Sequence, residues 1–568
     1  MKKNLPYYEV REIKNLKELL VGSCEEFKDK VAYLNKKKSG EPYTEIKYSQ
    51  VLNDVNALGT ALIDMGLKDK NIAVIGENRY EWCISYLSVV NGTGTVVPLD
   101  KELPEAEIES LLSRSNTVAI IYSKKKEEQI MNIRANRKTN VEYFISMDDT
   151  DNKGIINLSK LIKNGEELVG KGDSRFIDAE IDNEAARIIL FTSGTTDKSK
   201  AVLLSHKNIA SDIMSACGNV LITSKDMFFS VLPLHHTYEC TAGFLLPLYR
   251  GSSVAFCEGL RHIADNMKEA KPTMILGVPA IFENMYAKVW ATIEKKGLTK
   301  KVKTLIKISN ALLKVNIDIR KIVFKSIHEN FGGRLRLGIA GAAAINPEVS
   351  VGFRELGIFM IQGYGLTECA PLVTVNRDVY YNDGSAGRKV KGVDVMIYEP
   401  NEEGIGEVCV RGDNVMLGYY NDEEETNRVM KDGWFHTGDL GYFDKEDFLF
   451  LTGRLKSVLI TKNGKNVYPE EIESLLNKSS LIKESMVYQK DNKEKDDTII
   501  AAILVPDFDS VKATFGEISD EELKEKLWQE VKLVNEQLVS YKHIKEISIR
   551  DIEFEKTTTL KIKRYLVK

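Results

Sequence analysis

The feature that most constrains the fold of this chain is a repeated alternation of helical patterns with short apolar runs. Between Val51 and Met65, apolar residues recur at helical spacing, and four consecutive apolar residues follow at 72–75. Six more apolar runs are separated by segments of helical length, at 96–97, 119–121, 188–191, 254–256, 274–276 and 359–361. This order predicts an α/β fold with parallel sheets whose faces are covered by helices.

The pattern changes in the last third of the chain. Residues 393–397 and 406–410 alternate and are punctuated by glycine, which predicts antiparallel strands in a small β-rich unit. Further on, we expect strands near 458–460 and 499–505 and a helix whose apolar face contains Leu523, Leu527, Val531, Val534 and Leu538. A chain of 568 residues is too long for one hydrophobic core, so two or three domains are expected.

The composition excludes several classes of protein. With 43% hydrophobic and 29% charged residues, the chain is typical of a globular protein in water. Its formal charge of −4 provides no overall attraction to nucleic acid, so no nucleic-acid partner is expected. Seven scattered cysteines without a CxxC pair are typical of a reducing compartment. No apolar leader follows Met1 and no run approaches about 20 apolar residues, so we predict a cytoplasmic protein.

A loop rich in hydroxyl groups follows the apolar run at 188–191. Such a loop suits a phosphate, because glycine lets the backbone approach closely and the N–H and O–H groups donate to phosphate oxygens. The GK[ST] ending of a Walker loop is absent, and an ordinary Ser/Thr turn is the alternative. The candidate phosphate-binding residues are Thr192, Ser193, Gly194, Thr195, Thr196 and Lys200.

Further motifs follow in order along the chain: 232–236, 341–343, 362–368, 434–439, 453–456 and Lys561. Together with the hydroxyl-rich loop, they resemble the adenylate-forming superfamily of acyl-CoA synthetases, firefly luciferase and the adenylation domains of nonribosomal peptide synthetases. The resemblance implies a large N-terminal domain at 1–455, with two parallel-type α/β sheets and a small β-barrel-like unit. It also implies a smaller, mobile α+β domain at 456–568.

The same resemblance implies a site for ATP and Mg²⁺. Tyr364 would lie against adenine, Thr367 would meet the α-phosphate and Glu368 would hold Mg²⁺. Asp439 would accept both ribose hydroxyls, assisted by Arg454. Taken singly, these residues also fit a core tyrosine, a surface glutamate and a structural aspartate. The remaining nucleotide-binding candidates are Gly341, Ala342, Gln362, Gly363 and Gly365.

Four more roles are implied by the resemblance. Lys561 would be the catalytic lysine that bridges the attacking carboxylate and the α-phosphate, although a basic C-terminal tail is the alternative. His236 would lie near the acyl pocket. Lys456 would be the hinge about which the C-terminal domain rotates between two half-reactions, and Gly464 would line a pantetheine tunnel for CoA. Neither His235 nor His236 predicts a zinc site, because the histidines are scattered and no thiols cluster.

Residues 77–82, the form of the 362–368 motif and the ending 560–564 resemble the long-chain fatty acid–CoA ligase branch. The implied function is activation of a long-chain fatty acid to acyl-AMP, then transfer to CoA with release of AMP and pyrophosphate. An acyl carrier protein as acceptor is one alternative, and a non-catalytic, membrane-associated nucleotide- or acyl-binding protein is another. The phosphate loop departs from the family pattern at Asp197, Ser199 and Ala201.

Residues 295–325 form a basic segment. They contain ten Lys or Arg residues and one Asp, interleaved with apolar side chains. Such a segment can rest on an anionic bilayer, so peripheral contact with the inner face of the membrane is one hypothesis. A solvated helical hairpin with its own core face is the alternative.

Overall fold

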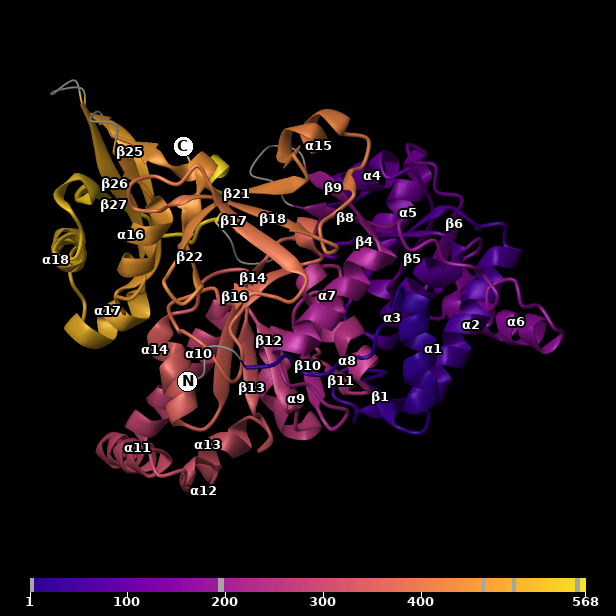
Figure 1. The fold of residues 1–568 in the computed structure, drawn as a ribbon, viewed down its shortest axis with the longest axis horizontal. Coiled ribbons are helices and arrows are strands. Elements are labelled where there is room, and N and C mark those ends of the chain that lie inside the picture. Colours follow the sequence, from indigo (N-terminus) through magenta and orange to yellow (C-terminus); the bar gives the residue numbers. More distant parts are fainter. Residues whose placement is uncertain (1–4, 193–198, 462–464, 493–496, 557–561, 568) are drawn as a thin grey trace. The chain divides into compact units, whose positions relative to one another are not determined.

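The computed structural model describes residues 5–192, 199–461, 465–492, 497–556 and 562–567 (Figure 1). The chain forms two compact units. The first contains most residues up to Phe435, and the second combines Val395–Cys409 with the chain from His436 onward. The expected domain boundary between 455 and 456 stays a prediction. In the described ranges, no helix has both the length and the apolarity that crossing a membrane requires.

An eight-stranded sheet forms part of the first unit, in the order β19–β9–β8–β4–β3–β5–β6–β7. The strands from β8 to β7 are parallel, and β9 and β19 extend one edge in antiparallel pairing. All four side chains of 72–75 in β3 are fully buried, which explains their uninterrupted apolar run. The strands are β3 (Asn71–Ile75), β4 (Thr95–Leu99), β5 (Thr117–Tyr122), β6 (Tyr143–Ser146), β7 (Ile156–Asn157), β8 (Ala186–Thr192), β9 (Lys200–Ser205) and β19 (Gly418–Tyr419).

Helices alternate with these strands, as the sequence predicts. The apolar pattern between Val51 and Met65 forms α2, whose side chains Val51, Val55, Leu58 and Leu62 are fully buried. The helices of this part are α1 (Leu16–Glu26), α2 (Tyr48–Asp64), α3 (Tyr80–Ser88), α4 (Glu105–Arg114), α5 (Glu127–Asn136), α6 (Leu158–Gly170) and α7 (His206–Asn219).

A nine-stranded sheet also belongs to the first unit, in the order β16–β15–β14–β13–β12–β10–β11–β1–β2. The strands from β14 to β1 are parallel and the outer strands are antiparallel. The strands are β1 (Val31–Asn35), β2 (Thr44–Lys47), β10 (Met227–Ser230), β11 (Ser253–Phe256), β12 (Met274–Gly277), β13 (Leu337–Ala340), β14 (Phe359–Gly365), β15 (Leu372–Val375) and β16 (Arg388–Lys389).

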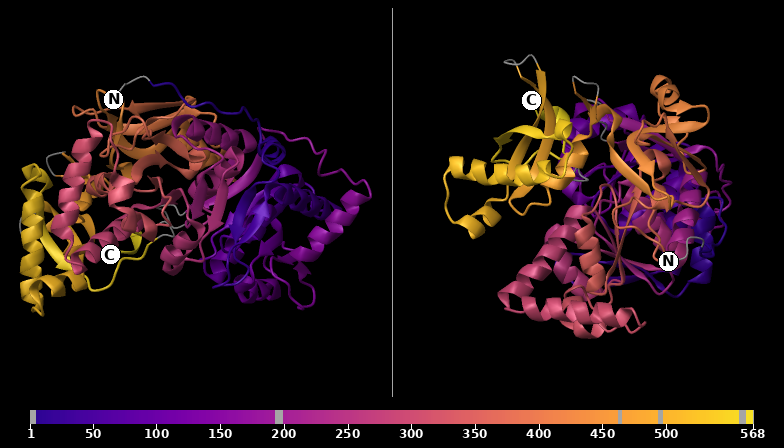
Figure 2. Two further views of the ribbon diagram at one scale, coloured as in Figure 1. Left: turned by 90° about the horizontal axis from the view of Figure 1, so that it is seen from below. Right: turned by 60° about the vertical axis from the view of Figure 1, so that its left-hand side comes forward.

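Several helices pack on this sheet through a shared core. Val289, Val302 and Phe353 come from three different helices and join Ile275 and Met360 of the strands. Figures 1 and 2 show these helices grouped beside the strands. The helices of this region are α8 (Leu246–Arg250), α9 (Ile263–Ala270), α10 (Pro279–Lys295), α11 (Thr299–Leu313), α12 (Arg320–Val323), α13 (Lys325–Asn330) and α14 (Pro347–Glu355).

A five-stranded sheet confirms the predicted β-rich unit. Its order is β17–β18–β21–β20, and β22 pairs with β21. β21 is antiparallel to both β20 and β22. The elements are α15 (Glu423–Val429), β17 (Val393–Tyr398), β18 (Gly406–Gly412), β20 (Met430–Lys431), β21 (Trp434–Phe443) and β22 (Leu449–Arg454).

The C-terminal segment is the small α+β structure that the sequence predicts. β25 is antiparallel and β27 parallel to β26, and the apolar face of α18 packs on this sheet through Leu527 and Val531. The helix ends at Asn535, so Leu538 of the predicted face lies beyond it. The elements are β23 (Leu459–Ile460), β24 (Asn466–Val467), α16 (Pro469–Leu476), β25 (Ile482–Asn492), β26 (Asp497–Pro506), α17 (Phe508–Phe515), α18 (Asp520–Asn535) and β27 (Ile544–Ile549).

Candidate functional site

The ends of the predicted phosphate loop are held by a pair of antiparallel strands. Thr192 of β8 lies opposite Lys200 of β9. The Lys200 ammonium pairs with the Glu425 carboxylate and lies 4.9 Å from the ring centre of Tyr419. The remaining loop candidates, Ser193, Gly194, Thr195 and Thr196, lie outside the described residues.

The predicted adenine-binding segment forms the end of the parallel strand β14. A Cβ atom on Gly365 would lie 2.0 Å from the backbone oxygen of Pro371, so the close approach of these two segments requires glycine. Tyr364 is buried, with 8% of its surface exposed. Gly363 and Tyr364 pair with β15, which fixes the direction of the strand end.

Both the oxygen and the nitrogen of the Gln362 side-chain amide form hydrogen bonds within the protein. Its Oε1 accepts a hydrogen bond from the Ile345 N–H at 3.1 Å, and its Nε2 donates to the Ser385 oxygen at 2.5 Å. Gln362 therefore holds the segment that contains Gly341 and Ala342 against β14. Its predicted contact with the nucleotide stays a prediction.

The glycine–alanine segment after β13 has an unusual backbone. Gly341 donates its N–H to the Gly277 oxygen at 3.1 Å, and Ala342 has a left-handed φ of +69°. A non-glycine residue in this region is uncommon and costs of order 1 kcal/mol or more. The Tyr238 ring lies 2.9 Å from the position of a Cβ atom on Gly341, so a larger side chain at 341 would clash with it. His236, the predicted residue near the acyl pocket, lies two residues before Tyr238 in the sequence. Its Nδ1 accepts a hydrogen bond from the Tyr238 N–H at 3.2 Å.

Glu368, the predicted Mg²⁺ ligand, lies in a 3₁₀ turn at Thr367–Cys369 directly after β14. Its Oε1 accepts a hydrogen bond from the Tyr419 hydroxyl at 2.9 Å, and its backbone oxygen accepts from the Met416 N–H at 2.8 Å. Burial and then the charge of Glu368 raise the pKa of Tyr419 well above its ordinary value, so the phenol stays neutral. No lysine or arginine among the described residues pairs with Glu368.

Tyr419 is therefore a site residue that the sequence did not reveal. It joins Lys200, at the base of the phosphate loop, to Glu368, at the end of β14. It lies on β19, which has only two residues and no apolar alternation. In the sequence, only the identity of the adjacent residue bears on this position: Gly418 has a φ of +143°, which favours glycine.

Asp439 lies opposite Arg454 across β21 and β22 in the second unit. The Arg454 Nε lies 2.8 Å from Asp439 Oδ1, and 9% of the aspartate side chain is exposed. Gly438, with a φ of +73°, allows the chain to turn before Asp439. The Thr437 hydroxyl donates to the Val408 oxygen at 2.7 Å and accepts the Asp439 N–H at 3.0 Å, which fixes the turn.

The C-terminal candidates are described only in part. Lys456 is exposed in a 3₁₀ turn at Leu455–Ser457, whereas Gly464 and Lys561 lie outside the described residues.

The described residues on both sides of Lys561 are held by backbone pairing and ion pairs. Lys556 and Ile562 form an antiparallel bridge, and the Lys556 ammonium pairs with Glu484 and, at 2.8 Å, with Glu553. On the other side, the Arg564 guanidinium pairs with Glu473 and Glu470.

Comparison with known families defines the class of this protein. Residues 21–420 match the family described as AMP-binding enzyme, and residues 456–567 match the AMP-binding enzyme C-terminal domain. The chain therefore belongs to the AMP-binding enzyme family, and it is an enzyme of the ligase type. This result confirms the resemblance that the sequence motifs indicate.

Individual relatives and structures agree with this assignment. The chain is 30% identical to Long-chain-fatty-acid–CoA ligase 5 of Rattus norvegicus, over 94% of this chain and 84% of that protein. It is 25% identical to the chloroplastic Long-chain-fatty-acid–[acyl-carrier-protein] ligase AEE15 of Arabidopsis thaliana, over 90% and 78% of the two chains. ATP-bound MatB from Rhodopseudomonas palustris has the same fold, with a TM-score of 0.74, 22% identity and 98% coverage of both chains. The predicted fold class is thereby confirmed.

Proposed function

We propose that this enzyme activates a long-chain fatty acid with Mg-ATP as the acyl-adenylate and then transfers the acyl group to CoA. AMP and pyrophosphate are the other products. The observation that carries the proposal is the arrangement of Lys200, Tyr419 and Glu368 at the end of β14 and the base of the phosphate loop. The 30% identity to a long-chain fatty acid–CoA ligase along nearly the whole chain supports the choice of substrate.

The residues around Glu368 fit a magnesium ion. Mg²⁺ prefers carboxylate oxygens and substrate phosphates as ligands. The Tyr419 hydroxyl orients one oxygen of Glu368 without neutralising its charge, and the lysine that contacts Tyr419 belongs to the predicted phosphate loop. Glu368 would hold the ion, which would offset negative charge on the phosphates.

The other roles follow from the family and remain part of the proposal. Tyr364 would pack against adenine, and Asp439 with Arg454 would bind the ribose. Thr367 would donate to the α-phosphate. Lys561 would stabilise the charge that moves between the carboxylate and the α-phosphate, and Lys456 and Gly464 would serve the second half-reaction.

Exchange of labelled pyrophosphate into ATP tests the first half-reaction. We expect exchange only when a long-chain fatty acid is present. Lys561→Ala should reduce the exchange at least about 100-fold, because a cation at the reacting centre is lost. The same variant should form acyl-CoA from supplied acyl-AMP at nearly the normal rate. Lys563→Ala is the matched control and should keep both activities, whereas equal loss of both steps in Lys561→Ala would refute the role of Lys561.

The acceptor and the chain length need separate assays. Offering CoA and a holo acyl carrier protein side by side should give acyl-CoA as the main product. If only the carrier protein is acylated, the second half of the proposal is wrong while the adenylation step stands. Initial rates across saturated acids of graded length should peak among long chains.

We also propose that the basic segment makes peripheral contact with an anionic membrane. One face of α11 packs in the core through Val302 and Ile306, which accounts for part of its apolar pattern. Other apolar side chains nearby remain exposed: Leu298, Ile308, Val315, Ile317 and Ile322, the last two at 51% and 76%. Exposed apolar side chains among lysines are what an anionic lipid surface binds.

Sedimentation with vesicles tests this contact. The protein should bind vesicles that contain phosphatidylglycerol at low salt and should be released as salt increases. Replacing Ile317 and Ile322 with serine should weaken binding several-fold. Leu260→Ser removes a side chain that is also 64% exposed but lies outside the segment, so it should have no effect. Equal binding by all variants would contradict the proposed surface.

A further inference from the structure

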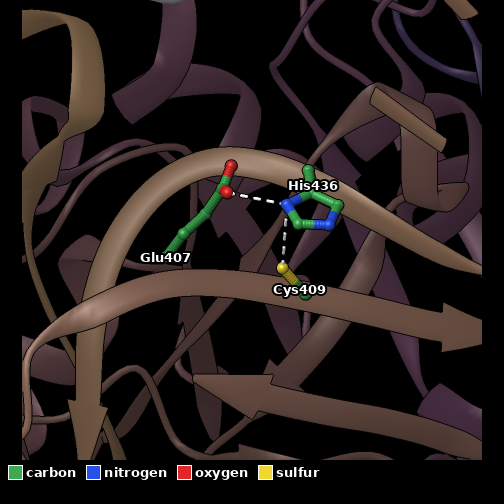
Figure 3. Close-up of side chains that lie close together, drawn as sticks. All are labelled: Glu407, Cys409 and His436. Carbon is green, nitrogen blue, oxygen red and sulfur yellow. Dashed lines mark hydrogen bonds and ion pairs between the residues drawn. The ribbon is translucent and has the colours of Figure 1, made fainter. Parts of the chain in front are cut away.

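Three potential metal ligands meet on the five-stranded sheet, and none of them has a role in the proposed reaction. Glu407 and Cys409 are two residues apart on β18, so their side chains lie on the same face of the strand. His436 projects from the neighbouring strand β21. Figure 3 shows the carboxylate of Glu407 and the sulfur of Cys409 directed at the same ring nitrogen of His436.

The distances are close to those of a coordination site. His436 Nδ1 lies 2.7 Å from Glu407 Oε2 and 3.4 Å from Cys409 Sγ, and all three potential ligand atoms lie within 4.8 Å of one another. In a tetrahedral zinc site, the nitrogen and oxygen would be about 3.4 Å apart and the nitrogen and sulfur about 3.6 Å apart. The nitrogen–sulfur distance therefore nearly fits such a site already, whereas the Glu407 oxygen must move about 0.7 Å farther from the imidazole nitrogen.

The surroundings favour ligands that are fixed before an ion binds. The other carboxylate oxygen of Glu407 accepts the Gly438 N–H at 2.9 Å, which holds the side chain in position. The Tyr398 ring contacts the His436 ring edge to face, with centroids 5.0 Å apart. Cys409 is fully buried, whereas 15% of the Glu407 side chain and 11% of the His436 side chain are exposed. An ion can thus enter past the carboxylate and imidazole.

We propose that Glu407, Cys409 and His436 form a binding site for Zn²⁺ or a similar divalent transition metal. A thiolate, an imidazole and a carboxylate are the ligands that Zn²⁺ takes in proteins, whereas Mg²⁺ avoids sulfur. The neutral imidazole of His436 binds the ion through Nδ1 and keeps its N–H proton on Nε2, whereas the thiol of Cys409 loses its proton to solvent. Three protein ligands leave a fourth position for water. This site shares no residue with the proposed Mg²⁺ site, whose ligand is Glu368.

Metal titration of the full-length protein tests the site without any measurement of ligase activity. After treatment with a chelator, the protein is titrated with Zn²⁺ alone, in competition with a chromophoric zinc chelator. We expect one strongly bound ion per chain. Cys409→Ser and His436→Gln should weaken Zn²⁺ binding at least about tenfold. Even mutations of residues that only hydrogen-bond to metal ligands typically reduce metal affinity about 10- to 100-fold. Cys257→Ser, which removes a thiol elsewhere, should leave binding unchanged.

Cobalt provides a second measurement that identifies the ligands. Co²⁺ bound by wild-type protein should show the near-ultraviolet band of thiolate-to-cobalt charge transfer, and Cys409→Ser should lack it. Glu407→Gln keeps the size of the side chain and should weaken Co²⁺ binding while the thiolate band persists. The proposal is wrong if wild type and Cys409→Ser bind Zn²⁺ equally, or if the cobalt complex shows no thiolate band. The three side chains would then serve only to hold the turn before Asp439.

Discussion

Glu368 and Asp439 are both carboxylates that the family resemblance assigns to a nucleotide, but the protein surrounds them differently. Glu368 accepts a hydrogen bond from the neutral phenol of Tyr419 at 2.9 Å. Asp439 instead pairs with the guanidinium of Arg454 at 2.8 Å. A phenol orients a carboxylate and leaves its full charge available, whereas a guanidinium offsets that charge at short range.

This difference matches the two ligands proposed for the carboxylates. A divalent cation requires an unneutralised carboxylate. Ribose hydroxyls are neutral and require only a well-placed acceptor, and an aspartate whose charge is offset repels the nearby phosphates less. The partner of each carboxylate therefore fits the part of Mg-ATP that the proposed function gives to it. This interpretation of the two carboxylates would be wrong if added Mg²⁺ had the same effect on the activity of variants at Glu368 and at Asp439.

The largest effect is expected from Asp439→Ala, which removes the acceptor for both hydroxyls. Hydrogen bonds to a charged acceptor contribute about 1.5–3 kcal/mol each, so the KM for ATP should rise about 100-fold or more. Added Mg²⁺ should not restore activity, and Asp439→Asn, which keeps one acceptor oxygen, should be intermediate. Pyrophosphate exchange at varied ATP measures the change.

The matched control for this experiment is another aspartate–arginine pair. Asp394 lies 2.9 Å from Arg411, and both side chains are more than half exposed. Asp394→Ala removes a similar pair from outside the proposed site and should leave the KM for ATP unchanged. An equal loss in both variants would mean that Asp439 acts on the stability of the protein and not on the nucleotide.

The sequence predicts the buried strands of the sheets, including the strand that precedes Glu368. The apolar runs at 72–75 and 359–361 became β3 and β14, because strands buried on both faces must be apolar throughout. The position of Glu368 after β14 followed from its motif. Glycine at 365 and 438 is now explained by close packing and by a positive φ.

The partners of these residues were not predictable in the same way. Tyr419 reaches Glu368 from 51 residues away on a two-residue strand, and no periodic pattern marks so short an element. Cys409 and His436 are 27 residues apart and meet through the pairing of strands, so the scattered cysteines and histidines gave no zinc signal. Motifs reveal residues near one another in sequence, whereas these contacts depend on sheet register.

A smaller effect, which sharpens the comparison, is expected from Glu368→Gln. The amide keeps the shape of the side chain but removes its charge, so the Mg²⁺ concentration for half-maximal exchange should rise about 10-fold or more. Raising Mg²⁺ should restore much of the activity. Asp439→Ala, assayed in parallel, should show no such rescue. If excess Mg²⁺ restores neither variant, Glu368 is not a metal ligand.

The smallest effect is expected from Tyr419→Phe. This change removes one hydrogen bond to Glu368 but leaves the carboxylate charge, so the Mg²⁺ requirement should rise only about 3- to 10-fold, as a loss of about 1 kcal/mol implies. Because the pKa of Tyr419 is raised, its hydroxyl remains a donor throughout the assay range, and the ratio of variant to wild type should stay constant from about pH 6 to pH 9. Tyr420→Phe removes the neighbouring hydroxyl and should have no effect. A Tyr419→Phe defect as large as that of Glu368→Gln would show that the phenol does more than orient the carboxylate.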